Sequence, residues 1–292
     1  MATTFQTIGL ISKLHHPEVT ETLSAVINHL QSKQLNIVLE EKTAKTVPDC
    51  ALPVVSREQL GKDCDLLIVV GGDGSLLNVA QTAAMYDVPI LGVNRGSLGF
   101  LTDIKPAEFN NKIDSILSGE YIEEKRFLLE SSADDQCSCS ALNEVMLVRG
   151  DTSKMIEFEI YIDDVFMCSQ RSDGVIIATP TGSTAYALSG GGPILHPNLD
   201  AIVMVPMCPH TLSSRPIVLE GDRCIRVVIA ESTKISPRIS CDNQSCIDIK
   251  PGSQINIRKM DKPLRLIHAP GYDYFETLRS KLHWGRELID ND

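Results

Sequence analysis

A glycine-rich turn directly after an apolar segment is the first stretch whose residue types could perform chemistry. Residues 65–70 read DLLIVV, which is typical of a parallel strand buried on both faces, and Gly71, Gly72, Asp73 and Gly74 follow immediately. In α/β sheets, ligands bind beyond the carboxyl ends of the strands. The glycines would let backbone amides approach phosphate oxygens closely, and a helix predicted over residues 75–86 would direct its positive N-terminal end toward them.

Asp73 is the unusual member of this turn, because a carboxylate repels phosphate. Its presence indicates a chemical task, either accepting the proton of a hydroxyl group or contacting a metal ion that bridges phosphates. The structural alternative is a tight turn in which Asp73 caps the helix. Leu77 stands where a G-x-G-x-x-G fingerprint would have its last glycine, and no Walker A motif occurs. The sequence therefore predicts neither an ordinary Rossmann dehydrogenase nor a P-loop NTPase.

A second candidate stretch, residues 171–193, reads as a buried strand, a hydroxyl-rich turn, a short helix and three glycines. Thr179, Thr181, Ser183 and Thr184 offer hydroxyl donors, and the start of the helix offers backbone amides. This composition suits a nucleotide, with capping of the helix by its Ser and Thr residues as the structural alternative.

Three further polar residues have two interpretations each. Asn143 and Glu144 interrupt an apolar strand, so they either bind a ligand or face solvent, and on their own the solvent-facing interpretation is favoured. Arg95 lies among glycines after a strand, where it could contact an anion or be a surface arginine.

The elements that must position these residues change character along the chain. The first part predicts strands at 7–12, 36–39, 65–70 and 89–93 that alternate with helices at 17–33 and 75–86, and a further helix near 106–117. Short strands then follow at 143–148, 155–162, 165–168, 174–178, 201–205, 216–219, 225–230, 237–241, 254–257 and 264–267. Residues 163–164 are predicted to form a two-residue hairpin turn. Residues 272–288 return to helical spacing with an apolar set, so we expect this tail to pack on the first domain.

The predicted fold is thus an α/β N-terminal domain with a Rossmann-like parallel sheet that carries the GGDG turn, plus a C-terminal antiparallel β-rich domain, sandwich-like in architecture. We expect residues 1–100 with 271–292 to form the first domain and residues 101–270 the second. The length of 292 residues agrees with two domains.

Composition excludes several classes of protein. The formal net charge of −11 argues against a nucleic-acid binder, and no apolar run approaches the 18 residues of a membrane span. We also expect no secretory signal. The nine cysteines are odd in number and form no C-x-x-C pair, so we expect reduced thiols in a cytoplasmic protein.

Taken together, these residues resemble the NAD kinase family, most closely its bacterial members, over nearly the whole chain. The resemblance rests on five motifs in order: GGDGSLL at 71–77, NRGSLGFLTD at 94–103, ALNEV at 141–145, SDGVIIATPTGSTAYALSGGGPI at 172–194 and ISCDNQ at 239–244. GGDG alone is shared with diacylglycerol-kinase-like and phosphofructokinase-like enzymes, whereas the ordered set is specific.

The resemblance implies an enzyme that phosphorylates the adenosine-ribose 2′-hydroxyl of NAD⁺ with ATP to give NADP⁺. It implies a divalent metal, Mg²⁺, as cofactor, and a homodimer or homotetramer whose β-rich domain binds NAD and mediates oligomerisation. The residues leave open whether polyphosphate can replace ATP and whether NADH is also a substrate.

Carried over by motif, the proton acceptor of the family falls on Asp73, flanked by Gly72 and Gly74, and the pair that contacts NAD falls on Asn143 and Glu144. The other implied nucleotide contacts are Lys154, Arg171, Asp173, Thr184, Ala185, Tyr186, Ala187, Leu188, Ser189 and Gln244. Lys154 and Arg171 are positions that vary within the family, and the metal ligands are not assigned.

Two other functions compete with this interpretation. A lipid or sugar kinase could reuse the GGDG turn, but it would leave the TGSTAY segment at 181–186 unexplained. A catalytically silent dinucleotide-binding regulator would not need Asp73 within a complete motif set.

Overall fold

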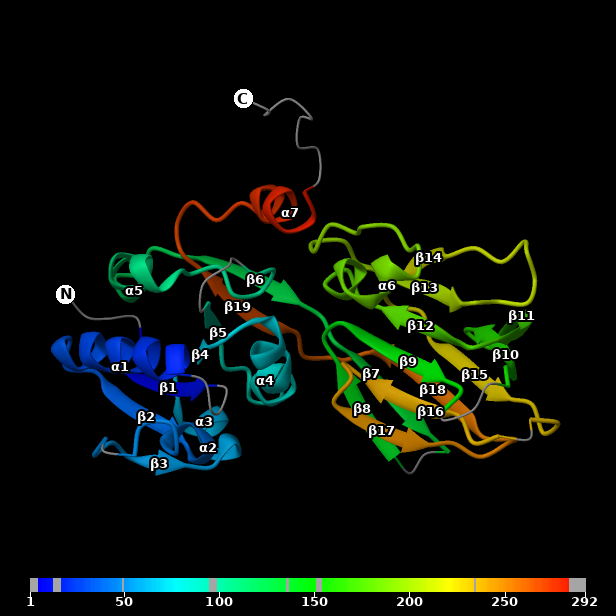
Figure 1. Cartoon of the computed structure of the whole chain (residues 1–292), viewed down its shortest axis with the longest axis horizontal. Coiled ribbons are helices and arrows are strands. Elements are labelled where there is room, and N and C mark those ends of the chain that lie inside the picture. Colours follow the sequence, from blue (N-terminus) through cyan, green and yellow to red (C-terminus); the bar gives the residue numbers. More distant parts are fainter. Residues whose placement is uncertain are drawn as a thin grey trace. The chain divides into compact units, whose positions relative to one another are not determined.

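The computed structural model describes residues 5–12, 17–48, 50–94, 99–134, 137–150, 154–233 and 235–283. The chain divides into two compact units (Figure 1), one made of Met1–Lys125 with Leu264–Asp292 and the other of Arg126–Pro263. Within the described ranges, no helix has both the length and the apolar character needed to cross a membrane.

The first unit is built on a sheet with the strand order β3-β2-β1-β4-β5-β19-β6. Its central strands pair in parallel, as the alternation of strands and helices predicts. The strands are β1 (Thr7–Ser12), β2 (Asn36–Glu40), β3 (Val54–Val55), β4 (Leu66–Val70), β5 (Ile90–Val93), β6 (Ile122–Arg126) and β19 (Leu264–His268). Every residue of β4 is buried, in agreement with the uninterrupted apolar run that predicts a strand covered on both faces.

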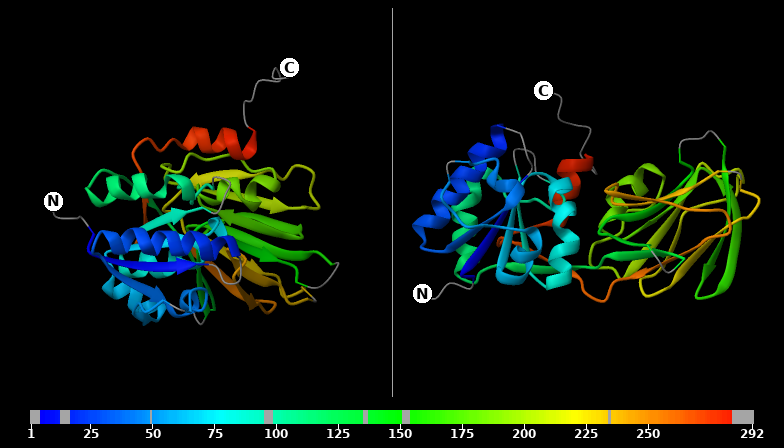
Figure 2. Two further views of the ribbon diagram at one scale, coloured as in Figure 1. Left: turned by 60° about the vertical axis from the view of Figure 1, so that its left-hand side comes forward. Right: turned by 90° about the horizontal axis from the view of Figure 1, so that it is seen from below.

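Helices cover both faces of this sheet (Figure 2). One hydrophobic cluster joins α1 and α5 to β1 through Ile8 and Leu10. Gly9, which alternates with them, faces Leu60 of α3, and α3 packs against α4. The helical segments are α1 (Pro17–Ser32), α2 (Glu41–Ala44), α3 (Arg57–Asp63), α4 (Asp73–Tyr86), η1 (Pro106–Glu108), α5 (Phe109–Leu117) and α7 (Tyr274–Leu282).

The domain boundaries differ from the predicted ones at 100 and 270. Leu264–His268 was expected in the β-rich domain, but Leu266 pairs in parallel with Ile90, so β19 completes the first sheet beside β6. The first unit therefore extends to Lys125 and resumes at Leu264. An apolar pattern predicts a strand but does not reveal its partner, which explains the error.

The expected return of the C-terminal tail to the first domain is confirmed for its described part. Tyr274 and Leu278 of α7 are buried, and the ring of Tyr274 lies 6.4 Å from that of Phe100, measured between centroids. Phe275 belongs to the apolar set that the helical spacing of residues 272–288 was expected to bury, but it is half exposed. Residues 284–292 lie outside the described ranges.

The second unit contains two antiparallel sheets, ordered β11-β10-β15-β18-β7-β8 and β14-β13-β12-β9-β16-β17. One hydrophobic cluster takes residues from both sheets, as the predicted sandwich requires. The elements are β7 (Leu129–Ala133), β8 (Cys137–Ala141), β9 (Glu144–Val148), β10 (Ile156–Ile162), β11 (Val165–Ser172), β12 (Gly174–Ala178), η2 (Gly182–Thr184), α6 (Tyr186–Ser189), β13 (Ala201–Met207), β14 (Ile217–Glu220), β15 (Ile225–Ile229), β16 (Arg238–Cys241), β17 (Ser245–Asp248) and β18 (Gln254–Lys259).

The hairpin of β10 and β11 agrees with its sequence pattern. Ile156, Phe158 and Ile160 are buried and alternate with half-buried polar residues. Asp163 and Asp164, the predicted turn, have φ values of 50° and 65°, and two consecutive positive values are what a type I′ hairpin turn requires.

The prediction that all thiols are reduced is wrong for one pair. Cys139 of β8 and Cys241 of β16 form a disulfide, and both residues are buried in the cluster that the two sheets share. They are 102 positions apart in the sequence, so their spacing gave no signal of pairing. Of the remaining cysteines that the structure describes, Cys50, Cys64, Cys168, Cys208 and Cys224 are free.

Candidate active site

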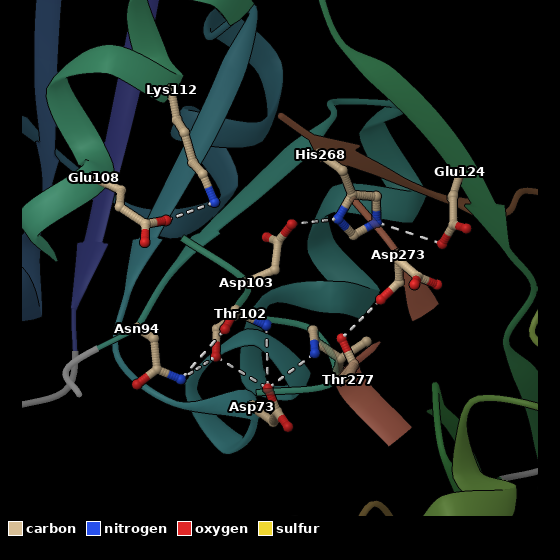
Figure 3. A network of polar contacts seen from close by, with 11 residues as sticks. Asp73, Asn94, Thr102, Asp103, Glu108, Lys112, Glu124, His268, Asp273 and Thr277 are labelled. Carbon is tan, nitrogen blue, oxygen red and sulfur yellow. Dashed lines mark hydrogen bonds and ion pairs between the residues drawn. The ribbon is translucent and has the colours of Figure 1, made fainter. Parts of the chain in front are cut away.

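Asp73 is the first residue of α4 and follows the turn that ends β4. Gly72 is the N-cap residue and no side chain caps this helix, so the alternative in which Asp73 serves as the cap is wrong. The Asp73 carboxylate instead accepts hydrogen bonds from residues 100–102, and Figure 3 shows those from Thr102. Its Oδ2 accepts the N–H of Phe100 at 2.9 Å, and its Oδ1 accepts the N–H of Leu101 at 3.0 Å. The N–H and the hydroxyl of Thr102 also donate to Oδ1, at 3.2 and 3.1 Å.

The segment that binds Asp73 is itself fixed from the neighbouring strand. The side-chain amide of Asn94, just beyond β5, donates to Oγ1 of Thr102 at 2.8 Å, and Thr102 is fully buried. Val93 and Ile104 form a parallel bridge. The carboxylate is therefore held by a rigid support rather than free to rotate. Arg95, which could contact an anion, lies outside the described residues.

The glycines near Asp73 differ in the space around them: Gly99 is tightly packed against the carboxylate, whereas Gly72 and Gly74 are open. A Cβ on Gly99 would lie 2.2 Å from Oδ1 of Asp73, so this glycine permits the close approach of the two segments. A Cβ on Gly72 or Gly74 would have no described atom within 4 Å. The open side of the turn thus offers room for a ligand, as the glycines led us to expect.

Replacing Gly74 by alanine should impair substrate access to Asp73 without lowering the stability of the fold. Gly74 is helical, and alanine favours helix over glycine by up to about 1 kcal/mol, so the free energy of unfolding should not fall. The added methyl group would occupy space next to Asp73, and we expect kcat/KM to drop about tenfold, roughly the effect of one misplaced contact. Chemical denaturation and steady-state kinetics measure the two quantities.

Gly99→Ala is the matched control, because its methyl group would collide with the carboxylate itself. It should lower both kcat/KM and the free energy of unfolding, the latter by about 1–3 kcal/mol, as overpacking does. Wild-type kcat/KM in Gly74→Ala would show that the open side of the turn is not used by a substrate.

Asn143 and Glu144 lie at the junction of β8 and β9, and Asp242 fixes their backbone. The Asp242 carboxylate accepts the N–H groups of Leu142 at 2.7 Å, Asn143 at 2.8 Å and Glu144 at 3.1 Å. Asp242 was not among the predicted site residues, although ISCDNQ contains it. An Asp-Asn pair between two strands was the available signal, since both residues tolerate the positive φ that they adopt here, 49° and 55°.

Glu144 is a buried carboxylate close to a second carboxylate, that of Asp242. It is 5% exposed, so the solvent-facing interpretation is wrong for it, whereas Asn143 is half-buried. Burial and, second, the charge of Asp242 raise the pKa of Glu144 to about 7. Its Oε2 is buried without a hydrogen-bond partner in the described part of the chain. An orphaned oxygen of this kind indicates that a ligand group completes the site.

Part of the hydroxyl-rich turn supports this junction from inside the protein. Thr179 donates its hydroxyl to the carbonyl of Leu142 at 2.5 Å and its N–H to that of Asn143 at 2.9 Å. Gly182 packs so closely on Asn143 that a Cβ would lie 2.1 Å from its carbonyl oxygen. Thr179 and Ser183 are fully buried, so their expected role as donors to a nucleotide is wrong.

Residues 184–189, which follow this turn, differ in how much of each side chain is exposed. Tyr186 is 46% exposed and Ser189 is exposed, while Thr184, Ala185 and Leu188 are half-buried. Ala187 is fully buried and its carbonyl accepts the N–H of Gly192 at 2.9 Å, so it has no side-chain surface to offer a ligand. Gln244 is exposed, two residues beyond Asp242.

Asp173, Arg171 and Lys154 lie at the opposite end of the same sandwich. Ala178 pairs with Glu144 and Gly174 with Val148, so Asp173, which precedes β12, is about 17 Å from Glu144 along the strand direction, at about 3.3 Å per residue. Asp173 forms an ion pair with Arg149 at 3.1 Å, and the exposed Arg171 lies 3.6 Å from Glu157. The exposed Lys154 precedes β10, whose first residue pairs with Ser172. Within the second unit, then, these three residues are not brought together with Asn143 and Glu144.

No preformed cage for a metal is found among the residues that the structure describes, because no group of three or more His, Cys, Asp or Glu side chains comes together there. Mg²⁺ does not need one, since it usually keeps several waters and binds one or two carboxylates together with substrate phosphates.

Comparison with known proteins accounts for both units. Residues 8–121 match the family model for the ATP-NAD kinase N-terminal domain, and residues 142–269 match that for the ATP-NAD kinase C-terminal domain. A NAD kinase of Teredinibacter turnerae is 52% identical over 284 residues, covering 96% of this chain and 97% of its own. A NAD kinase of Pseudomonas putida is 48% identical over 292 residues, with 99% of each chain covered.

Two solved structures share the fold. Yeast NADH kinase complexed with NADH superposes with a TM-score of 0.89 at 26% identity, covering 98% of this chain and 90% of the other. An Archaeoglobus fulgidus NAD kinase in complex with ATP gives a TM-score of 0.75 at 25% identity, with coverages of 95% and 99%. With both of its units matched and half of its residues shared with bacterial relatives, this chain belongs to the NAD kinase family.

Proposed function

We propose that Asp73 is the general base with which this NAD kinase phosphorylates the adenosine-ribose 2′-hydroxyl of NAD⁺. The observation that carries the proposal is the unequal use of its two oxygens. Among the residues that the structure describes, Oδ1 accepts three hydrogen bonds, whereas Oδ2 accepts one, from Phe100. A carboxylate oxygen has two lone pairs, so Oδ2 retains one for a substrate hydroxyl on the open side of the turn.

In this reaction the 2′-oxygen forms a bond to the γ-phosphorus of ATP while the bond to the β-phosphate oxygen breaks and ADP leaves. The hydroxyl proton passes to Oδ2 of Asp73. Phosphoryl transfer depends mainly on positioning and charge stabilisation, which the fixed carboxylate serves. A bound Mg²⁺ would neutralise charge on the phosphates, and the open turn, with amides and one carboxylate, suits phosphates that arrive with their own metal.

Glu144 and Asn143 are proposed to orient NAD through its hydroxyl or amide groups. A carboxylate accepts two hydroxyl hydrogen bonds readily but repels phosphate, which favours a sugar or an amide as the partner of Glu144. The buried Oε2, which has no hydrogen-bond partner among the described residues, supports this assignment. Tyr186, Ser189 and Gln244, which are exposed, are further proposed contacts, along with the half-buried Thr184, Ala185 and Leu188.

Formation of NADP⁺ from NAD⁺, ATP and Mg²⁺ tests the reaction directly. We expect a product whose phosphorus NMR signal, and whose reduction by an NADP-specific dehydrogenase, assign the phosphate to the 2′-position. The same assay with NADH and with polyphosphate defines the acceptor and the donor. NADP formation absent under all of these conditions, with NAD binding retained, would instead support a silent dinucleotide-binding regulator.

Self-association is proposed because Asp173 and Arg171 lie too far from Glu144 to contact the same ribose or phosphate. In a symmetric oligomer, the surface that carries them can complete the site of a second subunit. The β-rich unit, with many strand edges to cover, is the proposed interface.

Co-expression of two inactive variants tests this arrangement. Asp73→Asn and Asp173→Ala subunits should complement each other, because one site of each heterodimer receives both native residues. For random pairing into dimers, about a quarter of the wild-type activity should return. Activity that stays at the level of the separate variants, or a fully active monomer in sedimentation, would contradict the proposal.

The cytoplasm remains the proposed location. The Cys139–Cys241 disulfide is compatible with it, because both sulfur-bearing residues are buried and thiol exchange requires access to the bond.

A further inference from the structure

A buried cluster of charged side chains lies beside the segment that holds Asp73 (Figure 3). His268 ends β19, Glu124 belongs to β6, and Asp103 directly follows Thr102. Nδ1 of His268 lies 3.0 Å from Oδ2 of Asp103, and Nε2 lies 3.4 Å from Oε2 of Glu124. The side chains are 1%, 8% and 13% exposed for His268, Asp103 and Glu124. The proposed reaction gives this cluster no direct part.

The surroundings of His268 favour a charged imidazole. Nδ1 of His268 is hydrogen-bonded to Asp103, and Nε2 lies within ion-pair distance of Glu124, so a carboxylate faces each ring nitrogen and the protonated ring is the form that both stabilise. Burial alone would lower the pKa of His268, but the hydrogen bonds and charges of Asp103 and Glu124 together raise it above its usual value. The ring also stacks on Tyr272 with centroids 3.8 Å apart, which fixes its plane. A cavity of about 120 Å³ next to Asp103 is lined by further charges, from Lys105, Glu108, Lys112, Asp273 and Glu276.

Asp103 connects this cluster to the catalytic carboxylate. Its neighbour Thr102 donates two hydrogen bonds to Oδ1 of Asp73. The Oδ1 atom of Asp103 is buried without a hydrogen-bond partner among the described residues, so its orientation depends on the contact of Oδ2 with His268. Thr102 is therefore fixed from two directions, by Asn94 on one side and by the anchored Asp103 on the other.

We propose that His268 is a positioning residue for phosphoryl transfer, which fixes Asp103 and, through Thr102, the carboxylate of Asp73. The inference rests on the proposed role of Asp73. It predicts that a small displacement of the 99–103 segment reduces the rate of transfer while substrate binding is preserved. A misplacement of about 1 Å in such a support can cost about 10²-fold in rate.

His268→Asn and His268→Gln form the decisive pair. The asparagine amide nitrogen can replace Nδ1 and keep a donor toward Asp103, whereas the glutamine nitrogen can replace Nε2 and keep a donor toward Glu124. Both variants lose the same charge, so their melting temperatures should fall by similar amounts. We expect kcat to fall about 10- to 100-fold in His268→Gln and at least fivefold less in His268→Asn. KM for NAD and for ATP should stay within about threefold in both.

A purely structural role makes the opposite prediction, because kcat would then follow the loss of thermal stability and be equal in the two variants. Equal kcat values, or a greater loss in His268→Asn, would overturn the inference. If the histidine variants do not fold, Asp103→Ala and Glu124→Ala replace them, since each leaves His268 with one carboxylate. Asp103→Ala should then lose at least fivefold more kcat than Glu124→Ala.

Failure of this inference can be distinguished from failure of the proposed function. A strong loss of kcat in Asp73→Asn combined with equal kcat in each pair would reject only the role of His268. Near-normal kcat in Asp73→Asn would reject the base assignment, on which the positioning role depends.

Discussion

Asp73→Asn should lower kcat by about 10²–10⁴-fold, the range typical of general acid–base catalysis, with KM for NAD largely unchanged. The amide has no basic oxygen for the hydroxyl proton. It also disturbs the support, because its NH₂ group must face either the N–H of Phe100 or the three donors on the Oδ1 side. Steady-state kinetics at saturating NAD and ATP measures the loss, and thermal unfolding reports the structural part of it.

Thr102→Val distinguishes the basicity of the Asp73 carboxylate from the hydrogen bonds that hold it in place. It removes one of the four hydrogen bonds that the described residues donate to Asp73, together with the bond that Asn94 donates to Oγ1 of Thr102, and it keeps the carboxylate and the backbone donors. Loss of one hydrogen bond to a charged group corresponds to about 1.5–3 kcal/mol, so we expect a decrease of about tenfold to a hundredfold at most in kcat. Losses of equal size in the two variants would assign Asp73 a supporting role. Partial rescue of Asp73→Asn by excess Mg²⁺ would assign it to the metal instead.

The hydrogen bonds that hold the Asp73 carboxylate explain why the sequence predicted the importance of Asp73 but not the geometry around it. The turn follows β4 directly, so the burial of that strand and the three glycines located the site. The hydrogen-bond partners of Asp73 are residues 100–102, which lie 27 to 29 positions further along the chain. No periodicity in the sequence indicates that their N–H groups converge on one carboxylate. The role of Asp242 was not predicted for the same reason, because the backbone N–H groups that it binds lie about 100 positions earlier in the sequence.

Strands were predicted correctly where one face is apolar and buried. They were missed where their residues are small or charged. The alternation of Ile156–Ile162 predicted both the strand and its buried side. In contrast, IEEKR, LESSA and CSCSA became β6, β7 and β8 without an apolar pattern. Small and polar residues form strands when their neighbours in the sheet supply the pairing, which is tertiary information. The hydroxyl groups of Thr179 and Ser183 were misassigned because composition does not distinguish a donor to a ligand from one to the backbone.

Glu144→Gln should make the protein more stable at pH 8 and poorer at binding NAD. The pKa of Glu144 is about 7 in the folded state and near 4.5 in the unfolded state. Between these values the folded state binds more protons, so stability falls as pH rises through this window, and the full penalty is present above pH 7. Because glutamine cannot ionise, Glu144→Gln removes this penalty. The free energy of unfolding should therefore rise by about 1–3 kcal/mol at pH 8 and by nearly nothing at pH 4. Urea denaturation at both pH values measures the difference, with exposed Glu231→Gln as the control that should change by less than about 0.5 kcal/mol.

The same ionisation should govern the affinity for NAD. If the carboxylate form of Glu144 accepts the hydroxyl groups, lowering the pH from 8 to 6 protonates it and should raise KM for NAD about tenfold in the wild type, because one pH unit below the pKa leaves about a tenth of the groups ionised. KM for ATP should not follow this dependence. In Glu144→Gln, KM for NAD should be about tenfold higher at pH 8 and independent of pH, as expected for the loss of a hydrogen bond to a charged group. A wild-type KM for NAD that stays constant between pH 6 and 8, or a Gln variant that loses affinity for both substrates equally, would show that the buried Oε2 does not contact NAD. The stabilisation at pH 8 would then reflect only the removal of a charge buried beside Asp242.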